Sequence, residues 1–183
     1  AAKRRLRSAA GARGNSGVIL SLLFRGFAKA IKECETIDGR DLAIALDFGV
    51  AAAYKAVMKP AEGTILTVSR LAAAQAAAAA REENAAESVL EAAIREGQEA
   101  LADTINQNPV LKKAGVVDAG GKGFLVILQG MLDSLRGEPM PQVEEESAPA
   151  DKADFVAMAA EDITFAFDTV FIVRKHTEEV DLE

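Results

Sequence analysis

Cysteine, histidine and tryptophan are almost absent from this chain of 183 residues, which contains one cysteine, one histidine and no tryptophan. A single cysteine excludes a disulfide framework within the chain and any cysteine-based metal cluster built from one copy. Cys34 is predicted to be a small buried apolar side chain rather than a nucleophile, because no histidine lies near it in the sequence. The lone histidine, His176, is predicted to lie at the surface rather than to act as a general base.

Long uninterrupted apolar runs are also missing. No stretch approaches the roughly 20 apolar residues that a membrane span requires, and the opening AAKRRLR is not followed by the apolar core of a signal peptide. Because 50% of its residues are hydrophobic, the chain can still bury the core of one domain. We expect a soluble, cytoplasmic protein without a membrane span.

Positive charge is scarce beyond the first residues. The formal net charge is −7, and residues 1–13 hold five basic residues and no acidic one. The remainder therefore holds 16 of the 21 basic residues against all 28 acidic ones. This balance excludes a nucleic-acid-binding domain. The five basic residues next to a glycine-rich loop suit either a small polyanion or a solvated helix face.

Apolar residues recur at helical spacing through most of the first 137 residues. The pattern predicts an all-α fold, with helices over about residues 15–34, 38–60, 64–83, 84–105 and 123–136. Asp38 is a predicted N-cap, and Asn84 with Glu87 resembles a capping pair. Residues 106–117 are predicted to form a loop. The alanine tract of the third helix is expected to let neighbouring backbones approach closely.

The two ends of the chain differ from this helical part. AAKRRLRSAA has helix-forming composition without a capping residue before it, so we expect that an N-terminal portion is missing. Residues 138–160 are acidic and contain three prolines, which predicts a mobile linker. The acidic run Glu144–Glu146 is expected to be solvated rather than to bind a metal. Residues 161–183 contain an alternating pattern that predicts the first strand of a second domain.

Three polar, glycine-bearing segments interrupt the helical pattern: GARGNSG at residues 11–17, EGT at 62–64 and DAGGKG at 118–123. Each lies at or near the start of a predicted helix. The first turn of a helix offers unpaired N–H groups and a partial positive charge, and glycine lets the backbone approach an anion. The segments suit phosphate, although any one of them alone is better explained as an ordinary helix connection.

The segments GARGNSGVILS, EGTILTVSR and NPVLKKAGVVDAGGKG, in this order, resemble the N-terminal domain of the bacterial fatty acid kinase catalytic subunit. That domain is similar to the nucleotide-binding L subunit of dihydroxyacetone kinase. The resemblance covers about residues 1–137 and, more weakly, the strand after the linker. It implies a DhaL-like barrel of eight antiparallel helices, here incomplete with five to six, that binds ATP and magnesium at one end.

The resemblance also assigns nucleotide-binding residues. They are Gly14, Asn15, Ser16, Gly17, Thr64, Asp118, Gly120 and Gly121. The first four would contact the phosphates, with Thr64 nearby, and the last three would form the wall around the base and sugar. Arg13 would either neutralise phosphate charge or form a structural salt bridge.

The chain departs from the family at the metal. The family's magnesium ligands are aspartates upstream of the glycine loop, and no Asp or Glu precedes Gly14 in this sequence. We therefore assign no metal ligand and no catalytic residue within the chain. We expect it to lack kinase activity by itself, because phosphoryl transfer depends on metal ions that bridge phosphate oxygens.

These inferences predict part of an ATP-dependent kinase that phosphorylates a fatty acid carboxylate presented by a DegV-type lipid-binding protein. The alternatives are phosphorylation of dihydroxyacetone or another small hydroxy-ketone, and a nucleotide-binding or assembly module without catalysis. A barrel that lacks helices would expose the apolar faces that carry Leu22, Leu46 and Leu101. We therefore also expect a homodimer or a larger assembly.

Overall fold

The computed structural model describes residue 12 and residues 14–139. This part of the chain contains six helices and no strand. The helices are α2 (Gly14–Ala30), α3 (Gly39–Ala56), α4 (Ile65–Glu82), α5 (Ala86–Gln107), α6 (Pro109–Ala114) and α7 (Ala119–Leu135). The predicted all-α fold with five to six helices is confirmed. The predicted strand, and the predicted linker beyond residue 139, lie outside the described residues.

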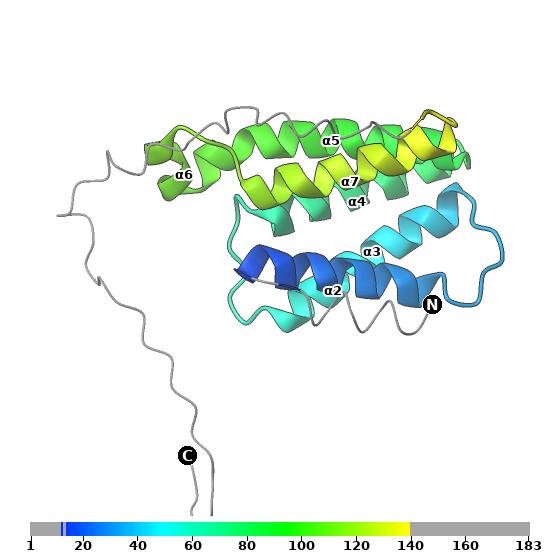
Figure 1. The fold of residues 1–183 in the computed structure, drawn as a ribbon, viewed down its shortest axis with the longest axis horizontal. Helices are drawn as coiled ribbons and strands as arrows, with labels where there is room; N and C mark the ends of the chain where they lie inside the picture. The colour runs from blue at the N-terminus through cyan, green and yellow to red at the C-terminus, as the bar shows by residue number, and fades with distance from the viewer. Residues whose placement is uncertain (1–11, 13, 140–183) are drawn as a thin grey trace, which may run out of the picture.

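Long helices that follow one another along the chain run antiparallel and form a bundle (Figure 1). α2 packs on α3, α3 on α4 and α4 on α5, and α7 packs on both α5 and α4. The short α6 joins α5 to α7 at one end of the bundle. As a result, the starts of α2, α4 and α7 all lie at that end, on the left in Figure 1.

The start of α3 follows directly from its sequence. The Asp38 carboxylate accepts a hydrogen bond from the Asp41 N–H at 2.9 Å, and the Asp41 carboxylate accepts one from the Asp38 N–H at 3.2 Å. This reciprocal pair satisfies two amide groups that the helix cannot pair itself. The predicted N-cap at Asp38 is confirmed.

Asn84 has a different role from the one predicted. Ala85 is the N-cap of α5 and makes no side-chain capping bond. Asn84 instead accepts a hydrogen bond from the Arg40 N–H at 2.7 Å and donates one to the Asp38 carboxylate at 2.7 Å. The capping prediction was wrong because the nearest unpaired amide belongs to α3, a helix 44 residues earlier in the chain.

Several helix boundaries also differ from prediction, since α3 ends at Ala56 rather than near residue 60 and α7 begins at Ala119 rather than near residue 123. α2 ends at Ala30 rather than near Cys34, and a turn over residues 31–33 follows it. The predicted loop over residues 106–117 contains α6, which has only 6 residues. Asn108 caps α6, Pro109 occupies its first turn, and Gly115 ends it with a φ of 64°. These are local start and stop signals, but six residues are too few to show a helical repeat.

Small residues bring the helices together. A Cβ at Gly49 would lie 2.6 Å from the Leu23 carbonyl oxygen, and a Cβ at Gly26 would overlap the Phe48 carbonyl oxygen. Any side chain at either glycine would separate α2 from α3. On α4, the alanine tract packs inward as predicted, and its buried members are Ala72, Ala73, Ala76 and Ala80.

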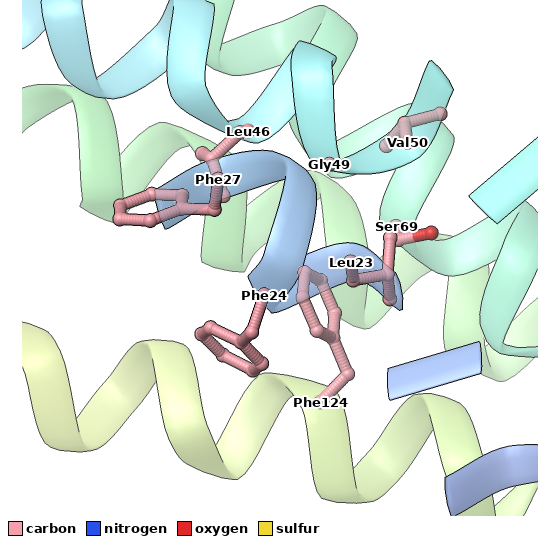
Figure 2. A pocket seen from close by; sticks show the side chains of 8 residues that line it. All are labelled: Leu23, Phe24, Phe27, Leu46, Gly49, Val50, Ser69 and Phe124. Atoms are coloured by element: carbon pink, nitrogen blue, oxygen red, sulfur yellow. The ribbon is translucent and has the colours of Figure 1, made fainter. Parts of the chain in front are cut away.

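The junction of α2, α3, α4 and α7 is apolar and closely packed. Figure 2 shows Phe24 and Phe27 of α2 with Phe124 of α7 and Leu46 of α3 around a small cavity. Its volume is about 10 Å³, which is at most enough for one water molecule. The cavity is therefore a packing defect of the core and not a ligand site.

The exposed apolar surface lies elsewhere than predicted. Leu46 is buried, and Leu22 and Leu101 are half-buried, so the expected exposure of these faces was wrong. An apolar groove of about 1,030 Å³ instead opens along the second half of α7, lined by Leu42, Leu90, Val126, Met131 and Leu135 among others. Val126 and Leu135 are the most exposed of these five side chains, at 65% and 57%.

Cys34 is exposed rather than buried, because it lies in the connection that follows α2 and not on the inner face of that helix. Among the described helices, none is both long enough and apolar enough to cross a membrane.

Candidate functional site: the glycine-bearing end of the bundle

The three glycine-bearing segments of the sequence meet at one end of the bundle. Gly14 begins α2, Thr64 is the N-cap of α4 and Asp118 is the N-cap of α7. All three helix starts lie at the left-hand end in Figure 1. Three sets of helix N–H groups, each with a partial positive charge, therefore face the same region.

Ser16 and Gly120 bring the first turns of α2 and α7 into contact. A Cβ at Gly120 would lie 3.1 Å from the Ser16 hydroxyl oxygen and 3.2 Å from the Asp118 Oδ2. A side chain at position 120 would therefore press on both polar groups. Glycine at this position therefore lets both the Ser16 hydroxyl and the Asp118 carboxylate lie against residue 120.

Asp118 is held from both sides. Its Oδ2 accepts a hydrogen bond from the Gly121 N–H at 2.7 Å, which caps α7. Its own N–H donates to the Thr104 hydroxyl at 3.1 Å, and that hydroxyl donates to the Leu101 carbonyl at 2.6 Å. Thr104 is fully buried, so α5 fixes the backbone position at which α7 begins. Sequence reasoning missed Thr104, because it pairs with Asp118 across 14 residues and belongs to no motif.

Gly121 connects α7 to α4. A Cβ at Gly121 would lie 2.8 Å from the Val68 Cγ2 and 3.3 Å from the Leu101 Cδ1. Val68 lies in the first turn of α4, where its N–H donates to the Thr64 carbonyl at 3.1 Å. The absence of a side chain at Gly121 therefore lets the start of α7 pack directly on the start of α4.

Thr64 is the N-cap of α4. Its hydroxyl accepts a hydrogen bond from the Leu66 N–H at 3.3 Å and donates one to the Ala61 carbonyl at 2.8 Å. Gly63 before it has a φ of 72°, a conformation that favours glycine. A Cβ at Gly63 would also lie 3.0 Å from the Gln107 Cβ, so the EGT turn sits against the end of α5.

A polar network around the buried Thr67, which the sequence did not reveal, supports the EGT turn. The Thr67 hydroxyl accepts from the Gly63 N–H at 2.9 Å and donates to the Glu62 carboxylate at 2.7 Å. Arg70 donates to the same carboxylate at 3.0 Å and to the Tyr54 hydroxyl at 3.1 Å. The Thr67 hydroxyl, followed by Arg70, lowers the pKa of Glu62, and the Tyr54 and Glu62 hydrogen bonds raise the pKa of Arg70.

The GARGNSG segment is the most open part of this end. Gly14 has a φ of 67° and nothing within 4 Å of the position of a Cβ. Asn15 and Ser16 are exposed, and the first turn of α2 contains no acidic residue. A Cβ at Gly17 would lie 3.7 Å from the backbone of Ala12. Arg13 lies outside the described residues.

The described part of the chain shows no metal site beside these groups. Within residues 14–139, no three His, Cys, Asp or Glu side chains are grouped so that they could hold a metal ion. Asp118 is the single acidic residue among the eight predicted site residues, and its carboxylate already caps α7. His176 and Glu144–Glu146 lie outside the described part of the chain.

Comparison with known proteins identifies the family. Residues 5–133 match the family model of the DAK2 domain. The match covers most of the chain, which therefore belongs to the DAK2 domain family. Its helical bundle is a DhaL-like module of the nucleotide-binding, kinase-related type.

The relatives are longer proteins. The chain is 47% identical over 171 residues to Protein YloV of Bacillus subtilis, and 44% identical over 169 residues to an uncharacterized protein of Staphylococcus saprophyticus. It is also 45% identical over 172 residues to an uncharacterized protein of Staphylococcus aureus. Each match covers 90% of this chain but only 31% of the relative. The chain thus spans about a third of the length of these relatives.

Proposed function

We propose that this chain is the nucleotide-binding part of an ATP-dependent kinase and that the glycine-bearing end of the bundle holds the phosphates. The observation that carries the proposal is the convergence of three helix starts at one end of a DAK2 domain. Helix N-termini favour anions through unpaired N–H groups and the helix dipole. Glycine at Gly14 and Gly17 leaves backbone accessible to such an anion.

Each of the three glycine-bearing segments has its own proposed role in binding the nucleotide. The residues of Gly14–Gly17 contact the phosphates, with the exposed Asn15 and Ser16 side chains as hydrogen-bond donors. Thr64 holds the EGT turn beside them. Asp118, Gly120 and Gly121 form the wall next to the base and sugar, where α7 meets α2 and α4.

Magnesium does not fit the described residues, since no group of metal ligands occurs among them. Phosphoryl transfer by ATP requires a metal ion that offsets charge on the phosphate oxygens. We propose that the ligands come from outside the described residues, and that this chain alone binds nucleotide weakly and transfers no phosphate.

The phosphoryl acceptor of the whole protein is proposed to be a fatty acid carboxylate presented by a DegV-type lipid-binding protein. The alternative acceptor is dihydroxyacetone or another small hydroxy-ketone, and the alternative class is a nucleotide-binding module without catalysis. Incubating the full-length protein with ATP, magnesium and each acceptor in turn distinguishes the three, because an acyl phosphate, a sugar phosphate or no product would form.

Calorimetric titration of this chain with ATP, with and without magnesium, tests the nucleotide site. We expect weak binding of equal strength under both conditions. Strong binding that depends on magnesium would contradict the proposal, because it would require metal ligands among the residues of this chain.

A further inference from the structure

Four side chains tie the EGT turn to the outer surface of the bundle. They are Tyr54 in the last turn of α3, Glu62 in the turn itself, and Thr67 and Arg70 in α4. Arg70 links the first two, because its Nε donates to the Tyr54 hydroxyl at 3.1 Å and its Nη2 donates to the Glu62 Oε2 at 3.0 Å. The Thr67 hydroxyl donates to the same Oε2 at 2.7 Å. We call these four side chains the EGT brace.

Polar contacts rather than apolar burial hold the EGT turn on the side of α3. All five residues before Gly63, from Met58 to Glu62, are exposed, and Met58 is 99% exposed. On its other side the turn rests against the end of α5, where a Cβ at Gly63 would lie 3.0 Å from the Gln107 Cβ. Gly63 has a φ of 72°, and its N–H donates to the Thr67 hydroxyl at 2.9 Å. The conformation of the turn therefore depends on the brace.

Arg70 is the member of the brace that joins α3 to the turn. Two different nitrogens of its guanidinium group donate to two different residues, and the planar fork of donors allows both bonds at once. Thr67 is 1% exposed, whereas the Arg70 and Glu62 side chains are 43% and 55% exposed. A surface ion pair by itself contributes little to stability. Here the pair is one link in a chain of hydrogen bonds that continues to the buried Thr67 and to the Gly63 N–H.

Arg70 points away from the proposed phosphate site. The Val68 side chain lies against Gly121 of α7, and two residues correspond to about 200° around a helix axis. Arg70 therefore lies on nearly the opposite face of α4, beside Tyr54 of α3. The start of α4, by contrast, is at the end of the bundle where α2 and α7 also begin (Figure 1). Thr64, the last residue of the EGT turn, caps that start.

We propose that Arg70 is a positioning residue of the nucleotide site, an inference that rests on the proposed function. Arg70 holds Glu62 and, through Thr67, also Gly63, and so fixes where α4 begins. The first N–H groups of a helix have no partner within the helix. A nucleotide can use them only if the helix start has the right position and direction. Arg70 acts on the phosphates through these N–H groups and does not touch the nucleotide itself.

Replacing Arg70 with methionine tests this role, because methionine keeps an unbranched apolar chain but removes both hydrogen bonds. In an NMR titration of the full chain with ATP, the affinity of Arg70→Met should be about fivefold lower than that of the wild type. Tyr54→Phe removes one of the two bonds and should give a smaller loss. The double variant should bind no more weakly than Arg70→Met, since Tyr54 acts through Arg70. Without nucleotide, the Gly63 amide should exchange with solvent faster in Arg70→Met than in the wild type.

Two variants are the controls, and both should keep the wild-type affinity for ATP. Arg81→Met makes the same change at an exposed arginine in the last turn of α4, and Asn84→Ala removes hydrogen bonds away from the brace. Wild-type affinity in Arg70→Met, an equal loss in Asn84→Ala, or unchanged exchange of the Gly63 amide would each overturn the proposal. A loss in Arg70→Met that Tyr54→Phe does not share at all would also overturn it, because Arg70 would then contact the phosphates directly. A wild-type chain that binds no ATP would contradict the proposed function together with this proposal, whereas the other outcomes concern Arg70 alone.

Discussion

Gly120 and Ser16 show what the sequence can predict about single residues and what only the fold reveals. The sequence placed both residues in a candidate nucleotide site, but only the fold shows that Gly120 is needed because α2 approaches within contact distance of it. Thr104 could not be found in the sequence, since its hydrogen bond with Asp118 spans 14 residues and follows no spacing rule. Thr67 bonds only to Gly63 and Glu62, four and five residues earlier, but the sequence analysis had assigned it no role. The candidate site was thus predictable from its motifs, whereas the residues that position those motifs were not.

Replacing Gly120 with valine should weaken nucleotide binding. The new side chain would push on the Ser16 hydroxyl and the Asp118 carboxylate, and overpacking of this kind costs about 1–3 kcal/mol of stability. Gly123→Val is the control, because it adds the same residue to the same helix at a position with nothing within 4 Å. Titration with ATP and urea unfolding should show losses for Gly120→Val that clearly exceed those of Gly123→Val; equal losses would contradict the role of the α2–α7 contact.

Glu62 should make stability depend on pH. Its pKa in the folded chain lies below the usual 4.5, chiefly because the Thr67 hydroxyl donates to the carboxylate, with a smaller effect of Arg70. A group with a lowered pKa stabilises the fold above its unfolded pKa and loses that effect as the pH falls through the folded pKa. Urea unfolding of the wild type should therefore lose stability below about pH 4.5 to a greater extent than Glu62→Gln does. Parallel pH profiles of the two proteins would exclude this contribution.

At the scale of the helix, local signals identified most elements. Asp38 caps the helix that the sequence assigned to it, and apolar periodicity located all five long helices. Asp118 also caps its helix, but the sequence analysis had assigned it only to the nucleotide site. α6 was missed because its six residues are shorter than two helical turns. The wrong cap was predicted for α5, because the Asn84 side chain pairs with the start of α3 instead. This pairing joins residues far apart in the sequence and therefore depends on tertiary packing.

Asn84→Ala should destabilise the contact between the start of α3 and the start of α5. It removes the hydrogen bonds from the Arg40 N–H and to the Asp38 carboxylate, and loss of a helix cap costs about 1 kcal/mol. Asn106→Ala removes a single exposed hydrogen bond, to Asp103 in the same helix, and serves as the control. Denaturant unfolding should show the larger loss for Asn84→Ala; a loss no greater than that of the control would mean that Asn84 does not stabilise α3.

At the scale of the whole molecule, an apolar groove lies along α7 in the described part of the chain. The groove measures about 1,030 Å³ and includes Val126, which is 65% exposed. Exposed contiguous apolar surface favours association, because water is released when two such surfaces meet. The sequence analysis expected the exposed apolar surface at other residues. That prediction was wrong for Leu46, because its burial depends on how closely α2 and α3 approach.

We expect this chain to form a homodimer or a larger assembly through that groove. Light scattering at micromolar concentration should give a mass above the 19.2 kDa of one chain. Val126→Glu should shift the mass toward a monomer, because it places a charge in the groove. Gln98→Glu adds the same charge on the exposed face of α5 and should leave the mass unchanged. A monomeric wild-type chain would show that the groove alone does not drive association.

The most direct test of the central claim is an NMR titration of the isotope-labelled chain with ATP. If the glycine-bearing end binds the nucleotide, amide signals should shift at Gly14–Gly17, at the first turn of α4 and at Ala119–Gly121, the three starts that converge in Figure 1. Signals at the opposite end, around Arg40 and Arg81, should stay in place. Shifts confined to that opposite end, or no shift at millimolar ATP, would contradict the account.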